Sequence, residues 1–205
     1  MTLKELVFMS TRRGYFIANQ YAPHFLTFTT VGWIDIFTRQ QCRDMVMNSF
    51  KYCIEHKGMN IHSYVIMSNH LHLVLSAQEG SDGLSCIIRD MKKYLSKSII
   101  KWVLNSRNES RTDWIKVVLK YHAKYNFNNK RYQLWQQHNR PMILEYPKIT
   151  RQKIAYIHYN PVKAGIVDNP DDYVYSSARN YVGRDDYLID VDVIDFGSEE
   201  GYVFI

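Results

Sequence analysis

The residues best suited to chemistry are two histidines one position apart in an apolar segment. His70 and His72 flank Leu71 within residues 62–75, which read as two strands joined by a polar turn. Because successive side chains of a strand point to opposite faces, the two histidines share one face. Two imidazoles side by side on a rigid sheet are natural metal ligands. Taken alone, the pair is equally typical of histidines that only pack or form hydrogen bonds.

A second pair of residues can supply what the histidines lack. Tyr156 and Asn160 are four positions apart in a predicted helix and therefore share a face, whereas His158 points elsewhere. An amide oxygen is a hard ligand that suits Mg²⁺ or Mn²⁺. A phenol one turn away can attack an electrophile that such a metal polarises. Since the chain has 16 tyrosines, a purely structural role for Tyr156 stays open.

Hydrophobic periodicity indicates the elements that must position these residues. Thr38 and Gln41 form a capping-box pattern at a helix start, and Gly58 is a typical helix stop. Pro161 is expected to end or kink the last helix. The predicted strands are residues 24–31, 60–67, 70–76 and about 132–144, and the predicted helices are residues 38–57, 84–104 and 149–159.

This order of elements predicts an α+β fold. Strand, helix, strand, strand, helix, strand and helix form a ferredoxin-like (RRM-like) antiparallel sheet with helices packed on one face and the histidines on a central strand. A chain of 205 residues is expected to form one domain. We assign residues 1–184 to it, with a basic insertion at about 105–131, and residues 185–205 to an acidic C-terminal tail.

The distribution of charge favours a polyanionic partner. The net charge of +6 conceals a strongly basic body, because every Lys and Arg precedes residue 185. The charged side chains of the tail are all acidic. This suggests the hypothesis that the tail lies across the basic surface and competes with nucleic acid. The alternative is a simple terminal strand. The acids are Asp185, Asp186, Asp190, Asp192, Asp195, Glu199 and Glu200.

A basic stripe follows the second predicted helix. Arg89, Lys93, Lys97 and Lys101 recur every four residues, with Lys92 beside them. Such a stripe is typical either of a solvated helix face or of phosphate contact. The residues expected to bind DNA are Arg12, Arg13, Arg89, Lys92, Lys93, Lys97 and Lys163.

The cysteines and the termini indicate a cytoplasmic location. Cys42, Cys53 and Cys86 lack metal-binding spacing and are expected to be free thiols in a reducing compartment. No segment approaches a membrane span, and the first residues lack a signal-peptide pattern. We therefore expect no membrane partner. A homodimer is possible and a monomer is not excluded, because no surface is plainly an interface.

Two long motifs resemble a known family. Residues 64–75 (YVIMSNHLHLVL) and 156–165 (YIHYNPVKAG), together with Phe25–Phe28, Trp135–Gln136 and residues 173–178, are similar to the REP-associated tyrosine transposases. These belong to the single-strand HUH transposases of the insertion-sequence-200 type. The resemblance spans about residues 20–182. The family often has Pro at the position of Ser68, and some branches have Gln at that of Asn160.

The resemblance implies an enzyme that cuts and joins single-stranded DNA next to a hairpin. It implies Tyr156 as the nucleophile, a 5′-phosphotyrosine intermediate, and a free 3′-hydroxyl that allows strands to be rejoined. It implies a divalent metal, Mg²⁺ or Mn²⁺, held by His70, His72 and Asn160, so that Tyr156, His70 and His72 form the catalytic set. The expected partner is single-stranded or hairpin DNA. The alternative is a non-catalytic ferredoxin-like nucleic-acid-binding protein, whose aromatic side chains only stack on bases.

Overall fold

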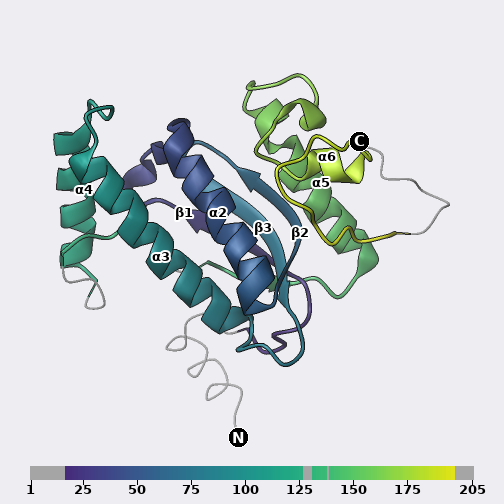
Figure 1. Ribbon diagram of the computed structural model, residues 1–205. Coiled ribbons are helices and arrows are strands. Elements are labelled where there is room, and N and C mark those ends of the chain that lie inside the picture. Colours follow the sequence, from purple (N-terminus) through teal and green to yellow (C-terminus); the bar gives the residue numbers. More distant parts are fainter. Residues whose placement is uncertain (1–16, 127–130, 138, 197–205) are drawn as a thin grey trace, which may run out of the picture.

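The computed structural model describes residues 17–126, 131–137 and 139–196, and a four-stranded antiparallel sheet forms its centre (Figure 1). The order across the sheet is β2-β3-β1-β4, so β3 lies inside the sheet with the histidine pair at its start. The predicted α+β fold is therefore confirmed. The strands are β1 (His24–Thr29), β2 (Met59–Ile66), β3 (His70–Ala77) and β4 (Met142–Ile143).

Helices and short 3-10 turns connect and cover these strands. The first two long helices lie side by side on one face of the sheet (Figure 1). The helices are α2 (Gln40–Lys57), α3 (Leu84–Asn105), α4 (Thr112–Lys124), α5 (Pro147–Lys163) and α6 (Ala178–Tyr181), and the 3-10 turns are η1 (Val31–Trp33), η2 (Ile36–Thr38) and η3 (Pro170–Asp172).

The two faces of the sheet carry separate hydrophobic clusters. Leu71 and Leu73 point toward α2 and α3 and belong to the larger cluster. Val74 points the other way and packs with Ile154 and Ile157 of α5. The prediction of helices on one face thus holds for α2 and α3, whereas α5 lies on the opposite face. That is the face that the alternation of β3 assigns to His70 and His72.

The structure differs from two local predictions at helix ends, the cap at Thr38 and the helix stop at Pro161. Thr38 does not cap α2; its hydroxyl donates to the carbonyl of Asp35 at 2.7 Å within η2, and α2 begins at Gln40. Pro161 does not end α5, which continues to Lys163 with the proline buried inside it. Gly58 does end α2, in the left-handed conformation with φ of +64° that glycine adopts without strain.

An edge segment runs antiparallel along β1. The predicted strand over residues 132–144 is regular only at β4, but backbone hydrogen bonds continue from it. The N–H of Thr27 donates to Asn139, the N–H of Gln136 donates to Thr29, and Trp135 forms a bridge with Thr30. This segment therefore fixes the open edge of β1 and separates the two faces of the sheet there.

The described part of the acidic tail packs against the body at the opposite edge of the sheet. Ile189 and Val191 are buried, and the N–H of Asp192 donates to the carbonyl of Ile61 in β2. Asp186 pairs with Arg184 at 2.7 Å. Up to residue 196 the tail thus lies beside β2; residues 197–205, which include Glu199 and Glu200, are outside the described residues.

Candidate nucleic-acid cleavage site

Strand β3 places the histidine pair on a partly buried surface. His72 is 6% exposed and lies opposite Thr27 of β1 and Val65 of β2. The ring centroids of His70 and His72 are 4.6 Å apart. Phe25, two residues before Thr27 on the same face, stacks on His72 with a centroid separation of 5.5 Å. The strands on both sides of β3 therefore hold the two imidazoles together.

Helix α5 brings Tyr156 and Asn160 to these histidines. The hydroxyl oxygen of Tyr156 lies 3.4 Å from Nε2 of His72, and the Tyr156 side chain is 39% exposed. The side chain of Asn160 forms a hydrogen bond with His70. Its Nδ2 donates to the carbonyl of Tyr156 at 2.9 Å, which leaves Oδ1 as its acceptor. The four residues selected from the sequence thus converge on one face.

Neighbouring side chains fix the orientation of each imidazole. Nδ1 of His70 donates to Oδ1 of Asn69 at 2.7 Å, and Nδ1 of His72 is hydrogen-bonded to the hydroxyl of Thr27 at 2.9 Å. A partner on one ring nitrogen selects the tautomer and directs the other nitrogen, Nε2, into the site. This is the arrangement that supports a histidine as a metal ligand.

Burial favours the neutral form of both imidazoles. Burial lowers the pKa of His70, although its hydrogen bond with Asn160 opposes the shift. Burial lowers the pKa of His72 to about 3, and the positive charges of His70 and Lys153 act in the same direction. Neutral imidazole is the form that coordinates a metal.

The donor set fits a small divalent cation. His70 and His72 offer two nitrogen donors and Asn160 offers one amide oxygen. In the part of the chain that the structure describes, no three His, Cys, Asp or Glu residues gather as a metal cluster. A metal held here would take its third protein ligand from the amide of Asn160, and such a mixed, uncharged set suits a cation that also binds an anionic substrate.

Two lysines flank the ring of Tyr156. Nζ of Lys153 lies 5.9 Å from its centroid and 5.0 Å from that of Phe25, and Nζ of Lys163 lies 5.7 Å from the Tyr156 centroid. Lys163 was predicted to bind DNA, whereas Lys153 and Phe25 were missed. Lys153 lies three residues before Tyr156, and this helical spacing was the signal that identifies it.

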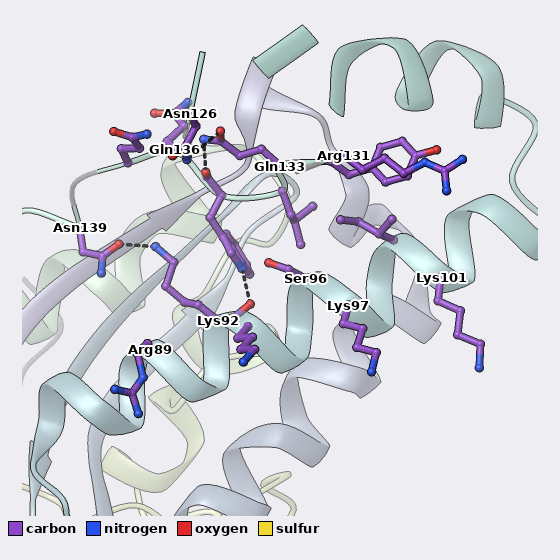
Figure 2. Close-up of a pocket in the computed structure, with 16 residues that line it drawn as sticks. Arg89, Lys92, Ser96, Lys97, Lys101, Asn126, Arg131, Gln133, Gln136 and Asn139 are labelled. Carbon is purple, nitrogen blue, oxygen red and sulfur yellow. Dashed lines mark hydrogen bonds between the residues drawn. The ribbon is translucent and has the colours of Figure 1, made fainter. Parts of the chain in front are cut away.

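A basic groove lies on the other face of β1. It has a volume of about 810 Å³ and is formed between α3 and a second wall made of Asn126, residues 131–137 and Asn139 (Figure 2). Thr27 and Phe28 alternate along β1, so Thr27 meets His72 while Phe28 meets Lys92 beneath the groove. The groove lining includes Arg89, Lys92, Lys93, Lys97, Lys101, Arg131, Tyr132 and Trp135.

Lys92 differs from the other basic residues of this groove. Its ammonium lies 4.8 Å from the centroid of Phe28 and donates to the side chain of Asn139, as Figure 2 shows. Burial lowers its pKa to about 8. Lys92 thus joins α3 to the edge segment, whereas Arg89, Lys93 and Lys97 are exposed. Arg12 and Arg13 lie outside the described residues.

Comparison with known proteins defines the class. The model of the family "Transposase IS200 like" matches residues 20–123, and the chain belongs to this family. The match includes β1, β3 and the histidine pair but ends before α5. The family match therefore does not cover Tyr156 and Asn160, and their place in the site rests on their contacts with His72 and His70 in the structure.

Individual relatives narrow the comparison. A Haemophilus influenzae protein assigned to the REP-associated tyrosine transposases is 24% identical over 143 residues, which cover 68% of this chain and 70% of that protein. A solved structure of a REP-associated tyrosine transposase bound to a REP hairpin has a TM-score of 0.60 and 22% identity, and the similarity covers 94% of this chain and 98% of that one. The expected resemblance to this branch is confirmed. No helix among the described residues is long and apolar enough to cross a membrane.

Proposed function

We propose that the chain cleaves single-stranded DNA next to a hairpin and rejoins it through a covalent bond between Tyr156 and a 5′-phosphate. The observation that carries this proposal is the position of the Tyr156 hydroxyl, 3.4 Å from Nε2 of His72 and on the same helical face as Asn160. The transposase family and the hairpin-bound structural relative support the substrate class.

The proposed reaction exchanges one phosphodiester for another. The Tyr156 oxygen attacks the phosphorus, its proton is released to solvent, and the bond from phosphorus to the 3′-oxygen breaks. The 3′-oxygen takes up a proton and leaves as a free hydroxyl. In the reverse step a 3′-hydroxyl attacks the phosphotyrosine and the phenol leaves. Because the phosphotyrosine keeps the bond energy, rejoining needs no nucleotide cofactor.

The side chains around Tyr156 supply binding and orientation. We propose that His70, His72 and Asn160 hold Mg²⁺ or Mn²⁺, which would neutralise the scissile phosphate. Lys153 and Lys163 place two positive charges beside the ring of Tyr156, where an anionic strand has to pass. Because His72 is largely buried, a phosphate bound beside it would lose part of its water shell. Its electrostatic attraction to the metal and to the two lysines would then be stronger.

The basic groove gives the second half of the proposal. Arg89, Lys93 and Lys97 lie along one helix and are suited to phosphates of a duplex stem, and Lys92 supports the groove from below. The edge segment at residues 134–143 joins the groove to the candidate cleavage site. A hairpin held in the groove would therefore present its flanking strand across this edge toward Tyr156.

A denaturing gel tests the chemistry. The chain is incubated with Mn²⁺ and a labelled oligonucleotide that contains a hairpin and single-stranded flanks, and a covalent adduct is expected. Tyr156→Phe should abolish the adduct and leave binding within about twofold, because only the nucleophilic oxygen is removed. Tyr159→Phe, on the same helix, is the matched control and should retain the adduct. An adduct formed by Tyr156→Phe would refute the assignment of the nucleophile.

The alternative of a non-catalytic binding protein gives a different result in the same assay. A non-catalytic binding protein would need only the basic groove. It would not explain why Tyr156, Asn160 and the two histidines converge on one face. Binding of the hairpin by the unmodified chain, without any adduct in Mn²⁺ or Mg²⁺, would favour that alternative.

A further inference from the structure

Helix α4 exposes an apolar strip to solvent. Trp114, Val117, Tyr121 and Tyr125 follow one another at spacings of three or four residues and are 50%, 65%, 56% and 72% exposed. Such spacing places them on one helical face. The opposite face of α4 carries buried residues, including Leu119. The helix is therefore anchored through one face while the other is uncovered in the described structure.

The rings of the strip support one another. Tyr121 and Tyr125 meet edge to face with centroids 5.3 Å apart, and Tyr121 also meets His122 at 5.5 Å. Contacts of this kind hold aromatic side chains in a defined orientation in water. The strip thus presents ordered ring surfaces, at the end of the molecule farthest from α5 (Figure 1).

A strained turn places another aromatic residue beside α4. Trp33 is 63% exposed and has a φ of +54°, a left-handed conformation that costs energy for any residue except glycine. The preceding Gly32 lies directly against α4, where an added Cβ would come within 2.7 Å of Val118. The fold thus tolerates a strained backbone at a residue whose large indole ring is exposed. We take this as a reason to expect that the indole contacts a ligand.

Lysines border the strip on its other side. Lys116, Lys120 and Lys124 recur every four residues, and Lys120 and Lys124 are exposed. Asp113 is the single acid of α4 and lies in its first turn. The surface is thus aromatic in the middle and positive along one border. This combination complements an unpaired nucleic acid strand, whose bases stack on rings and whose phosphates meet ammonium groups.

The composition of the strip argues against a protein partner. Protein interfaces are depleted of lysine, whereas here lysine forms one whole border of the strip. The last ring of the strip is also close to the basic groove along the chain, since Tyr125 directly precedes Asn126, which lines the groove. A strand that leaves the groove at the end marked by Asn126 would therefore be near the ring of Tyr125.

We propose that the α4 strip, with Trp33 beside it, binds unpaired DNA bases of the second single-stranded flank of the hairpin in the basic groove, the flank that does not run toward Tyr156. The inference rests on the proposed function for the identity of its ligand and extends that function to a site remote from the cleavage chemistry. Stacking of this kind tolerates any base, so the strip adds affinity for a single-stranded extension without reading its sequence.

Fluorescence anisotropy with two labelled oligonucleotides tests the proposal. One is a blunt hairpin, and the other is the same hairpin with a ten-nucleotide single-stranded extension. The double variant Trp114→Ala with Tyr121→Ala should weaken binding of the extended oligonucleotide about tenfold or more and leave the blunt hairpin within twofold. Tyr52→Ala, which removes an exposed ring from α2, is the matched control and should change neither. Lys120→Gln with Lys124→Gln should reduce the salt dependence for the extended oligonucleotide only.

The remaining outcomes overturn the proposal. Equal losses for both oligonucleotides, or no loss for either, would show that the strip does not bind the extension. A concentration-dependent dimer that the Trp114→Ala variant dissociates, at unchanged DNA affinity, would identify an interface between copies instead. The adduct assay on a denaturing gel is independent of this binding assay. The unmodified chain could form no adduct while the strip variant still binds the extended oligonucleotide more weakly. In that case the proposed chemistry would be refuted and the proposed stacking site would be supported.

Discussion

The ion pair that fixes the start of α4 gives the most quantitative prediction. The side chain of Glu109 is inaccessible to solvent and lies between Arg39 and Arg111. It accepts from Nε and Nη2 of Arg39 at 2.8 and 3.1 Å, and from Nε and the backbone N–H of Arg111 at 3.1 and 3.0 Å. Arg111 also pairs with Asp35 at 2.6 Å. One carboxylate therefore joins the residue before α2 to the loop before α4.

We expect Glu109→Gln to lower the free energy of unfolding by about 3 kcal/mol at pH 7, the lower end of the cost of breaking a buried ion pair. The hydrogen bond from Arg39 is the largest cause that lowers the pKa of Glu109, to about 2 from the ordinary 4.5. A shift of that size is consistent with about 3 kcal/mol. For a chain of this length it corresponds to a decrease in Tm of about 6–12 °C.

The pH dependence of Glu109→Gln distinguishes an electrostatic cause from a packing defect. The carboxylate stabilises the fold above its unfolded pKa, and this contribution is lost as the pH falls from about 4.5 to about 2. The difference between wild type and variant should therefore shrink over that interval. Urea unfolding followed by circular dichroism at pH 7, 4 and 3 measures it. Glu145→Gln, at an exposed carboxylate, is the control. A cost no larger than that of the control, or one that stays constant at pH 3, would refute the reasoning.

Two further predictions concern the sheet. Tyr64 is fully buried, and its hydroxyl has no hydrogen-bond partner among the described residues, so Tyr64→Phe should leave the free energy of unfolding unchanged or raise it by up to about 1 kcal/mol in urea unfolding; a loss above 1 kcal/mol would reveal a partner. Thr27→Val removes the hydroxyl that orients His72 and should weaken Mn²⁺ binding about 10–100-fold in calorimetry, with Thr38→Val, at an exposed hydroxyl in η2, as the control. Equal affinity for Mn²⁺ in both variants would contradict the role of Thr27 in orienting His72 as a metal ligand.

The central residues of the site could be predicted because each follows from a local periodicity. Strand alternation places His70 and His72 on one face, and helical spacing places Tyr156 and Asn160 on another. That the two faces meet depends on α5 lying on the side of the sheet away from α2 and α3. Nothing in the local pattern specifies that side, and the prediction had placed all helices on one face; the resemblance to the family supplied only the expectation that the two pairs of residues meet.

The residues that the sequence did not reveal depend on pairings between distant segments. Thr27 reaches His72 through the register of β1 against β3, 45 residues apart, and Lys153 reaches Phe25 only once α5 has docked. Glu109 lay in a region expected to be an irregular basic insertion, yet it is the buried acid that organises this region. Single-sequence patterns report the face on which a residue lies but not the element that covers it.

Strand β1 lies between the candidate cleavage site on one face of the sheet and the basic groove on the other. Thr27 supports His72 on one face and the adjacent Phe28 lies under Lys92 on the other, so a slip of one residue would exchange the two faces and disrupt both. The hydrogen bonds of Thr27 with Asn139 and of Gln136 with Thr29 hold this register at an edge that is otherwise open. Because Asn139 also accepts from Lys92, the segment that fixes the register contacts the groove as well. A hairpin bound in the groove, as proposed, would therefore contact the same segment that aligns Thr27 with His72, and we expect its binding to affect the alignment of the candidate cleavage site through β1.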